Sequence, residues 1–246
     1  METHSQSNNQ RRLLIKLDGI TFRYPGSTAN IIDKLDLKLY RNDRIGLMAP
    51  NGSGKTTLFY LIMGLLKPAA GQIHIFGKPV SSENDFKLIR RRIGLLFQDA
   101  DDQLFSPTVL EDVAFGPLNQ GKTPAQAKKI SIETLTTLGL NNFENRITHK
   151  LSGGEKKLVS LATVLAMKPE ILLLDEPSTG LDKATKALLI NLIAKLDISY
   201  ILISHDHHFL NKLSKSIYSM ENGKISTELI LHRHFHNHPK NSFYMH

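Results

Sequence analysis

Continuous apolar runs that end in polar residues recur along this chain and predict the strands of a buried parallel sheet. Such runs occupy residues 45–48, 93–97, 171–174 and 200–203. A strand that is covered on both faces shows an unbroken apolar run rather than an alternation. In open α/β sheets ligands bind beyond the carboxyl ends of the strands, so the polar residues that follow these runs are candidate site residues.

A different pattern, in which apolar and polar positions alternate, marks the N-terminal part of the chain. Residues 13–17 and 19–24 are expected to form two strands closed by a turn at 25–26, and residues 31–40 a third, half-buried strand. A further short strand is expected at residues 71–77. Together these strands predict a small antiparallel β-subdomain beside the parallel sheet.

Helical spacing of apolar positions appears between and after these strands. It covers residues 124–138, 140–145 and 156–167. The segment from residue 99 begins with an acidic stretch and then becomes helical in pattern. We interpret about residues 99–165 as a helical subdomain inserted into the α/β fold.

Composition limits the classes to which this chain can belong. Its 246 residues, 41% of them hydrophobic, suffice for one α/β domain with insertions or for two small domains. The absence of cysteine excludes disulfides and thiol chemistry. The polar N-terminus lacks a secretory signal and no apolar stretch approaches ~18 residues, so a soluble or peripheral protein is expected. The net charge of +8 favours an acidic partner, but scattered basic residues do not indicate nucleic-acid binding.

A Gly-rich turn between the first apolar run and a helical pattern is the strongest chemical signal. Gly52 and Gly54 allow a tight turn whose N–H groups, together with the positive end of the next helix, can hold phosphate oxygens. Lys55 supplies a charge for the β- and γ-phosphates, and the Thr56 hydroxyl suits Mg²⁺. Ala49 stands where the pattern asks for glycine. The residues expected to bind ATP here are Ala49, Pro50, Asn51, Gly52, Ser53, Gly54, Lys55, Thr56 and Thr57.

Polar residues at the ends of the other apolar runs extend the candidate site. Asp175 is expected to hold Mg²⁺, and Glu176 to orient or deprotonate the attacking water. Gln98 can ligate Mg²⁺ through its amide oxygen. His205 could reach the γ-phosphate, although a lone histidine at such a place is more often structural.

A second helix terminus that can bind an anion is expected at Ser152. Its hydroxyl is a natural N-cap, and Gly153 and Gly154 leave the following N–H groups exposed. Tyr24 lies just before a turn, where its ring could stack on an adenine base or serve as an ordinary strand aromatic.

Together these motifs resemble those of the ATP-binding-cassette (ABC) family, over residues 13–225. The matching segments are Tyr24 (adenine stacking), Ala49–Thr56 (Walker A), Gln98 (glutamine loop), Leu151–Glu155 (signature), Leu172–Glu176 (Walker B), Ser178–Asp182 (D-loop) and His205 (switch histidine). The resemblance implies an α/β fold with a P-loop NTPase (RecA-like) ABC ATPase core, an N-terminal antiparallel β-subdomain and an inserted helical subdomain. Three positions depart from the usual family pattern: Ala49 replaces Gly, Glu155 replaces Gln and Leu158 replaces Arg.

The segments 97–109 and 111–119 are similar to those of energy-coupling-factor importer ATPases, especially the cobalt/nickel branch. This resemblance implies an ATPase that binds ATP and Mg²⁺ and sits peripherally on the cytoplasmic face of the cell (inner) membrane. Its implied partners are transmembrane importer subunits, namely a coupling protein and a substrate-binding component, and a second ATPase subunit in a homodimer or heterodimer. In that dimer each ATP would also contact Ser152, Gly153, Gly154 and Glu155 of the other subunit.

The tail from residue 226 to 246 carries histidines that suit a transition-metal ion. They are His232, His234, His236 and His238. Imidazole binds Ni²⁺ and Co²⁺, so this expected flexible tail points to a metal cargo, while a disordered basic terminus is the plain alternative. A vitamin importer of the same type, a soluble non-transport ABC ATPase and a small-molecule kinase remain alternative functions.

Overall fold

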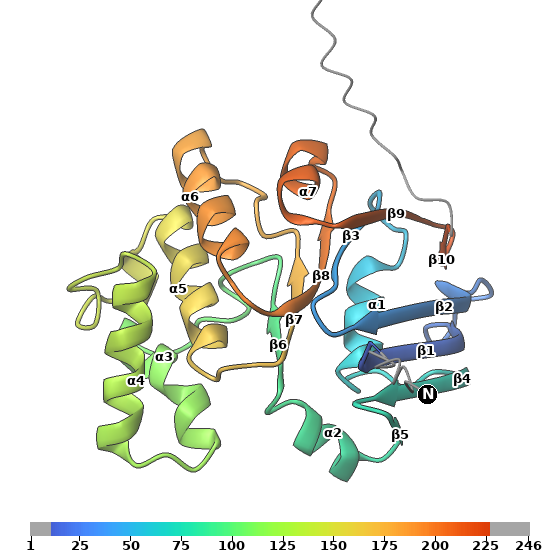
Figure 1. The fold of residues 1–246 in the computed structure, drawn as a ribbon, viewed down its shortest axis with the longest axis horizontal. Coiled ribbons are helices and arrows are strands. Elements are labelled where there is room, and N and C mark those ends of the chain that lie inside the picture. The colour runs from blue at the N-terminus through green and yellow to red at the C-terminus, as the bar shows by residue number, and fades with distance from the viewer. Residues whose placement is uncertain (1–10, 227–246) are drawn as a thin grey trace, which may run out of the picture.

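The centre of the molecule is a six-stranded, largely parallel sheet. The computed structural model describes residues 11–226, and the strand order in this sheet is β10-β9-β3-β8-β7-β6 (Figure 1). The strands are β3 (Arg44–Met48), β6 (Ile93–Leu96), β7 (Ile171–Asp175), β8 (Ser199–Ser204), β9 (Ser216–Glu221) and β10 (Lys224–Ile225). Only β10 runs antiparallel to its neighbour. All four apolar runs therefore form parallel strands, as the sequence predicts.

A second, four-stranded antiparallel sheet lies on the N-terminal side of the molecule. Its order is β2-β1-β4-β5, with β1 (Leu13–Phe22), β2 (Ile32–Tyr40), β4 (Ala70–Ile75) and β5 (Lys78–Val80). The prediction of two strands at 13–17 and 19–24 is wrong, because the structure has one continuous strand there. Gly19 has a φ of 59°, and the pairing register shifts between Leu17 and Ile20. A bulge of this kind bends a strand without ending it.

Seven α-helices complete the described part of the chain. They are α1 (Lys55–Ile62), α2 (Glu83–Ile89), α3 (Val109–Asn119), α4 (Pro124–Thr137), α5 (Gly153–Leu165), α6 (Lys183–Ala194) and α7 (His207–Leu213). Figure 1 shows α3, α4 and α5 side by side at the end of the molecule away from the antiparallel sheet. The division of the chain into a core and an inserted helical subdomain of about residues 99–165 stays an interpretation.

The predicted helical segment at 140–145 is wrong. The structure has turns there, followed by a short 3₁₀ helix at Thr148–Lys150. Gly139 and Asn142 have φ values of 74° and 64°, and single residues in this left-handed region end a right-handed helix.

Alternate residues of the parallel strands face two separate hydrophobic cores. Leu173 and Ile203 pack with α1 and the antiparallel sheet. Leu174 and Leu202 pack with α5, α6 and α7 on the opposite face. This double burial explains why the strands read as unbroken apolar runs, and it leaves their carboxyl ends free for polar residues.

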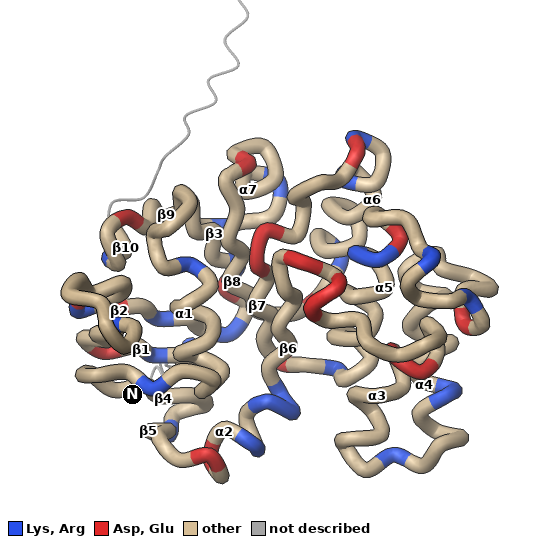
Figure 2. The backbone as a smooth tube through the Cα atoms, turned by 180° about the vertical axis from the view of Figure 1, so that it is seen from behind, with Lys and Arg blue, Asp and Glu red and all other residues tan. Residues whose placement is uncertain are grey.

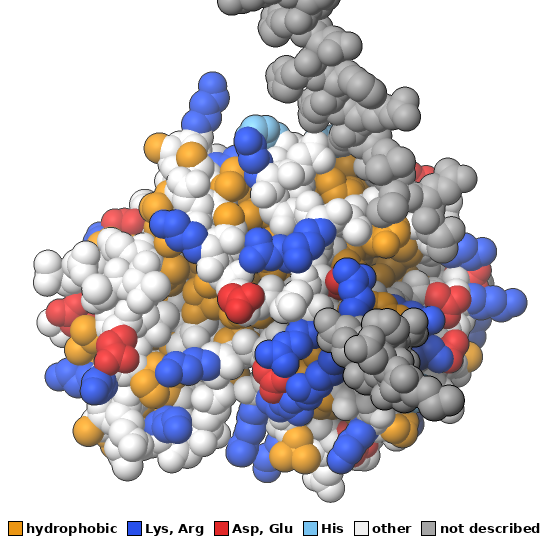
Figure 3. All heavy atoms as spheres, viewed as in Figure 1, with side chains coloured by type: hydrophobic (Ala, Val, Ile, Leu, Met, Phe, Trp, Pro, Cys, Tyr) orange, Lys and Arg blue, Asp and Glu red, His pale blue; other side chains and the backbone are white. Residues whose placement is uncertain are grey.

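Charged residues are distributed unevenly between the two sides of the molecule. Lys and Arg side chains are spread over the whole face seen in Figure 3. On the reverse side, acidic positions gather around the ends of β6 and β7 (Figure 2). Within the described residues, no helix is long and apolar enough to cross a membrane.

Candidate ATP-hydrolysis site

The turn between β3 and α1 has the backbone that a phosphate-binding loop requires. Gly52 and Gly54 have φ values of 80° and 93°, and Gly54 is the N-cap of α1. A Cβ on Gly54 would lie 2.8 Å from the carbonyl oxygen of Ile31, so glycine is required for both conformation and space. Ala49 is buried in the core and its φ is not positive. Alanine therefore replaces glycine at this position without backbone strain.

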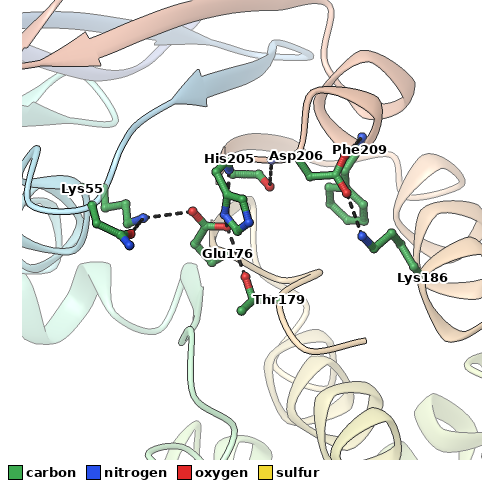
Figure 4. Close-up of polar contacts among 9 residues, drawn as sticks. Lys55, Glu176, Thr179, Lys186, His205, Asp206 and Phe209 are labelled. Atoms are coloured by element: carbon green, nitrogen blue, oxygen red, sulfur yellow. Dashed lines mark hydrogen bonds and ion pairs between the residues drawn. The ribbon is translucent and has the colours of Figure 1, made fainter. Parts of the chain in front are cut away.

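Lys55 links this loop to the end of β7. Its Nζ lies 3.0 Å from Oε1 of Glu176 and 3.1 Å from Oδ1 of Asn51 (Figure 4). Both members of the ion pair are buried, at 7% and 1% exposure. The structure thus brings together two residues that are 121 positions apart and that were predicted separately from their motifs.

Thr56 and Asp175 form an oxygen-rich corner beside this pair. The Thr56 hydroxyl donates to Oδ2 of Asp175 over 2.8 Å. The other carboxylate oxygen, Oδ1, is buried and lacks a hydrogen-bond partner, as does the hydroxyl of Ser53. Burial raises the pKa of Asp175, although the Thr56 hydrogen bond and the charge of Lys55 oppose that shift. Hard oxygen donors with an unused carboxylate oxygen fit Mg²⁺, because this ion takes one or two carboxylates and completes its shell with phosphate and water.

Glu176 occupies the middle of the site. Its Oε2 lies 2.9 Å from Nδ1 of His205 and 3.3 Å from the Thr179 hydroxyl (Figure 4). Burial would raise the pKa of Glu176, but the hydrogen bonds from Lys55 and His205 outweigh it and lower the pKa. Glu176 also has a φ of 43°. Strain of this kind in a non-glycine residue persists where the surrounding contacts impose it, typically at functional sites.

Two predicted residues border this centre without joining it. Tyr24 is 40% exposed, and its hydroxyl lies 3.1 Å from that of Thr57, so its ring is available beside the phosphate loop. Gln98 is exposed just after β6, and among the described residues its side chain forms no hydrogen bond to Thr56 or Asp175.

The second predicted phosphate-binding terminus opens to solvent. Ser152 caps α5, since its hydroxyl accepts from the Glu155 N–H while the Glu155 carboxylate accepts from the Ser152 N–H. Gly153 is exposed, and a Cβ there would meet nothing within 4 Å. The hydrogen bond from Arg146, with that from the Ser152 N–H, lowers the pKa of Glu155. Leu158, where the family usually has Arg, is buried in the hydrophobic core.

The sequence analysis did not identify several charged residues that support the elements around the site. Lys186 pairs with Asp206 over 2.7 Å, and Asp206 caps α7 directly after His205 (Figure 4). Lys157 is buried on α5. Its position gave a signal, because it lies four residues before Leu161 on the apolar side of a helical pattern, where a charged residue is unusual.

Comparisons with known proteins agree with this geometry. A family model described as ABC transporter matches residues 32–179. A protein of Nitratidesulfovibrio vulgaris with the provisional name ABC transporter ATP-binding protein is 49% identical over 91% of this chain and 83% of its own. The energy-coupling factor transporter ATP-binding protein EcfA of Methanothermobacter thermautotrophicus is 41% identical over 87% of this chain and 70% of its own.

Solved structures show the same architecture. CbiO1 of Clostridium perfringens, described as part of the ABC transporter complex CbiONQ, superposes with a TM-score of 0.78, at 31% identity over 87% of each chain. A dimeric ATP-binding cassette bound to ADP and Pi has a TM-score of 0.79, at 25% identity over 86% of this chain and 96% of its own.

Proposed function

This chain belongs to the ABC transporter family and is the ATP-hydrolysing subunit of such a transporter, and on that premise we propose that it powers a metal importer. The importer is of the energy-coupling-factor type, and its cargo is cobalt or nickel. The ATPase sits peripherally on the cytoplasmic face of the membrane. The main evidence for ATP hydrolysis is that four side chains contact one another beside the phosphate loop, namely Lys55 with Glu176 and Thr56 with Asp175.

The phosphate loop and Lys55 bind the β- and γ-phosphates of ATP. To do so, Lys55 leaves Glu176, with which it pairs in this structure, and moves its charge to the phosphate oxygens. Thr56 and Asp175 would hold Mg²⁺, and Gln98 would supply a further ligand through its amide oxygen. When bound, this ion supplies positive charge to the phosphate oxygens.

Glu176 orients and deprotonates the attacking water. The hydrogen bonds from Lys55 and His205 lower its pKa and keep it ionised in this structure. Release from Lys55 frees Oε1 and removes a contact that lowers the pKa, so the buried carboxylate becomes a stronger base. His205 contacts the other carboxylate oxygen, so it holds Glu176 in place and lies where it can approach the γ-phosphate. The buried pair of Lys55 and Glu176 and the contact of Glu176 with the exposed His205 support both roles.

Two subunits pair head to tail to complete each site. The N-terminus of α5, with Ser152, Gly153, Gly154 and Glu155, is exposed at Ser152 and Gly153, and it can offer the N–H groups of the two glycines to an anion from another subunit. A second subunit places that terminus on the γ-phosphate. The dimeric cassette with ADP and Pi among the similar structures supports this arrangement.

A cavity of about 350 Å³ between β6, α3 and α5 receives the membrane-embedded coupling protein. Phe105 and Phe115 line it, pack edge to face at 4.9 Å, and remain 68% and 47% exposed. Exposed aromatic pairs are costly in an isolated surface and typical of protein interfaces. Phe97, Asp102 and Gln103 also line this cavity, so a docked partner contacts the loop that carries Gln98.

The proposed metal cargo is supported by sequence rather than by the fold. The segments 97–109 and 111–119 resemble the cobalt/nickel branch, and the histidines from His232 to His238 suit the same ions, although they lie outside the described residues. Within residues 11–226, no group of three or more His, Asp and Glu side chains is placed to hold such an ion. The tail is therefore the part of the chain proposed to bind the metal weakly.

Uptake measurements test the function. Cells that lack the gene are compared with complemented cells for uptake of labelled nickel, cobalt and vitamins, and the chain is purified from membranes in mild detergent with its partners identified. Lost metal uptake supports the proposal. Lost vitamin uptake with intact metal uptake identifies a vitamin importer, and co-purification with ribosomes or DNA alone identifies a soluble ABC ATPase. Truncation after Leu231 with unchanged nickel binding by the isolated subunit contradicts the role of the tail.

A further inference from the structure

A buried lysine lies behind the loop that carries Gln98. Lys157 on α5 is 4% exposed. Its Nζ donates to the backbone carbonyl oxygens of Gln98 at 2.6 Å and of Phe97 at 3.2 Å. Burial lowers the pKa of Lys157, although the carboxylates of Asp99 and Asp175 oppose that shift.

Packing alone does not explain a lysine at this position. A buried ammonium without a direct carboxylate partner carries a desolvation cost that an apolar side chain of similar length avoids. Among the described residues Lys157 has no ion pair, and its ammonium donates to the two carbonyl oxygens. The ammonium therefore acts by orienting the backbone. Because it donates to the carbonyl oxygens of two consecutive residues, it fixes the peptide planes on either side of Gln98.

A second contact ties the same loop to the same helix. Gln103 accepts from the Phe97 N–H over 3.2 Å. It also donates to the Ser160 carbonyl at 2.8 Å and to the Thr163 hydroxyl at 2.7 Å. The segment 97–103 is thus attached to α5 through Lys157 and Gln103, and at its exposed side through the ion pair of Asp101 with Lys156. The helix α5 begins at the Ser152 terminus. The loop beside the Mg²⁺ corner is joined to the helix proposed to reach the other nucleotide.

We propose that Lys157 is a positioning residue for metal binding: its ammonium holds the backbone of Gln98 so that the amide oxygen reaches Mg²⁺ held by Thr56 and Asp175. This inference rests on the proposed role of Gln98 as a ligand. It does not depend on the cargo, the membrane partner or the tail. Because Lys157 acts through the Gln98 backbone, losing the ammonium weakens metal binding without weakening metal-free nucleotide binding.

The test compares Lys157→Met with a matched control on the neighbouring residue. Lys156→Met removes the same charge and also a contact to the same loop, the ion pair with Asp101 at 2.6 Å, but it leaves the carbonyl oxygens of Gln98 and Phe97 bound by Lys157. For each full-length variant, Mn²⁺ affinity is measured by electron paramagnetic resonance with a non-hydrolysable ATP analogue, and nucleotide affinity is measured in EDTA. Mg²⁺ activation of hydrolysis is followed in parallel.

Lys157→Met should weaken Mn²⁺ binding about 10-fold or more, the usual effect of losing a residue that orients a metal ligand. Nucleotide affinity in EDTA should stay unchanged, and Lys156→Met should resemble the unmodified protein in both. Gln98→Ala should weaken Mn²⁺ binding similarly, and the double variant should add little to the larger single effect, because both changes remove one interaction.

Equal Mn²⁺ affinity in the two lysine variants overturns the inference. Full additivity in the double variant also overturns it, since Lys157 then acts by another route. If Gln98→Ala binds Mn²⁺ as tightly as the unmodified protein, Gln98 is not a metal ligand. This result distinguishes failure of the ligand assignment from failure of the Lys157 proposal.

If Lys157→Met does not fold, the lack of cysteine in the chain supplies a second variant. Lys157→Cys is alkylated while unfolded, either with an aminoethyl group that restores an amine or with a neutral propyl group, and is then refolded. Recovery of Mn²⁺ binding only with the amine supports the proposal, whereas an amine-modified protein that refolds without regaining Mn²⁺ binding overturns it. Equal recovery with both groups overturns it.

Discussion

Asp175 and Glu176 are adjacent carboxylates whose surroundings shift their pKa values in opposite directions. Burial raises the pKa of Asp175, which has one oxygen without a partner. For Glu176, burial is outweighed by hydrogen bonds from Lys55 and His205, which lower its pKa. When the surroundings of two neighbouring carboxyl groups move their pKa values apart, the two groups can take different chemical roles. Here the orphaned oxygen suits a metal ion and the ionised carboxylate suits a general base.

Glu176→Gln tests the general-base role. The amide keeps the shape of the carboxylate but cannot accept the proton of water, so hydrolysis should fall on the order of 10²–10⁴-fold while ATP binding persists. Single-turnover hydrolysis and equilibrium ATP binding, together with size-exclusion chromatography, measure this and should reveal a trapped ATP-bound dimer. Near-normal turnover in the variant contradicts the assignment.

Ala49→Gly tests whether the unusual alanine impairs the phosphate loop. Ala49 is buried with a φ that is not positive, so glycine gives no geometric advantage. We expect ATP affinity to change less than about two-fold and stability to fall by roughly 0.5–1 kcal/mol, because glycine adds backbone entropy to the unfolded chain. ATP titration and urea unfolding measure the two effects. A clear gain in affinity would show that alanine weakens phosphate binding.

At the scale of elements, the sequence predicts some parts well for physical reasons. The run at 171–174 forms β7, because burial on both faces leaves an unbroken apolar signal. Residues 124–138 contain α4, with Thr123 as its cap. The helix α3 was not predicted as such, since Gly116 and Pro117 interrupt its helical pattern.

Contacts between individual side chains could not be predicted from the pattern of apolar and polar positions. The sequence predicts that Lys55 and Glu176 both belong to the site, but not that they form an ion pair with each other. The helix α2 has only seven residues, too few for its periodicity to be recognised, although its capping box at Ser82 and Asp85 was readable. The burial of Lys157 depends on a loop that lies 59 residues earlier.

Glu155→Gln tests the charged cap of α5. The pKa of Glu155 is lowered from 4.5, first by Arg146. A lowered folded-state pKa means that the carboxylate stabilises the fold above the unfolded pKa, and that this contribution is lost as pH falls through the folded pKa. Glutamine keeps the capping geometry without the ion pair, so the variant should lose about 0.2–1 kcal/mol at pH 7.

The difference between Glu155→Gln and the unmodified protein should begin to shrink as pH falls below 4.5, the unfolded pKa, and should disappear only below the lower folded-state pKa, where Glu155 is uncharged in both states. Urea unfolding across the acid range measures it. A constant difference at all pH values would mean that the change acts through packing or capping rather than through the charge.

For the whole molecule, exchange of subunits tests the composite site. Gly153→Asp has open space for its side chain, and an acid near a helix N-terminus is favourable, so its fold should be as stable as before. The same carboxylate should repel the γ-phosphate of the partner's ATP. Lys55→Met disables the phosphate loop instead.

Each variant alone should be inactive, and a mixture should regain hydrolysis, because about half of the randomly paired dimers contain one intact composite site. The ATPase rate of mixed dimers, with pairing confirmed by differently tagged subunits, measures this. Mixed dimers without any recovered activity would contradict head-to-tail sharing.

The position of β3 in the parallel sheet also governs the order in which a newly made chain can fold. Its neighbours are β8 and β9, which begin at Ser199 and Ser216. The antiparallel sheet pairs within the first 80 residues and can form early. By contrast, the strand that bears the phosphate loop waits for about 150 further residues, roughly 8–30 s on a ribosome. In chains arrested before Ser199, limited proteolysis should cut near β3 while β1 and β2 are already protected. During synthesis, nucleotide therefore cannot help this protein to fold until its last strands emerge.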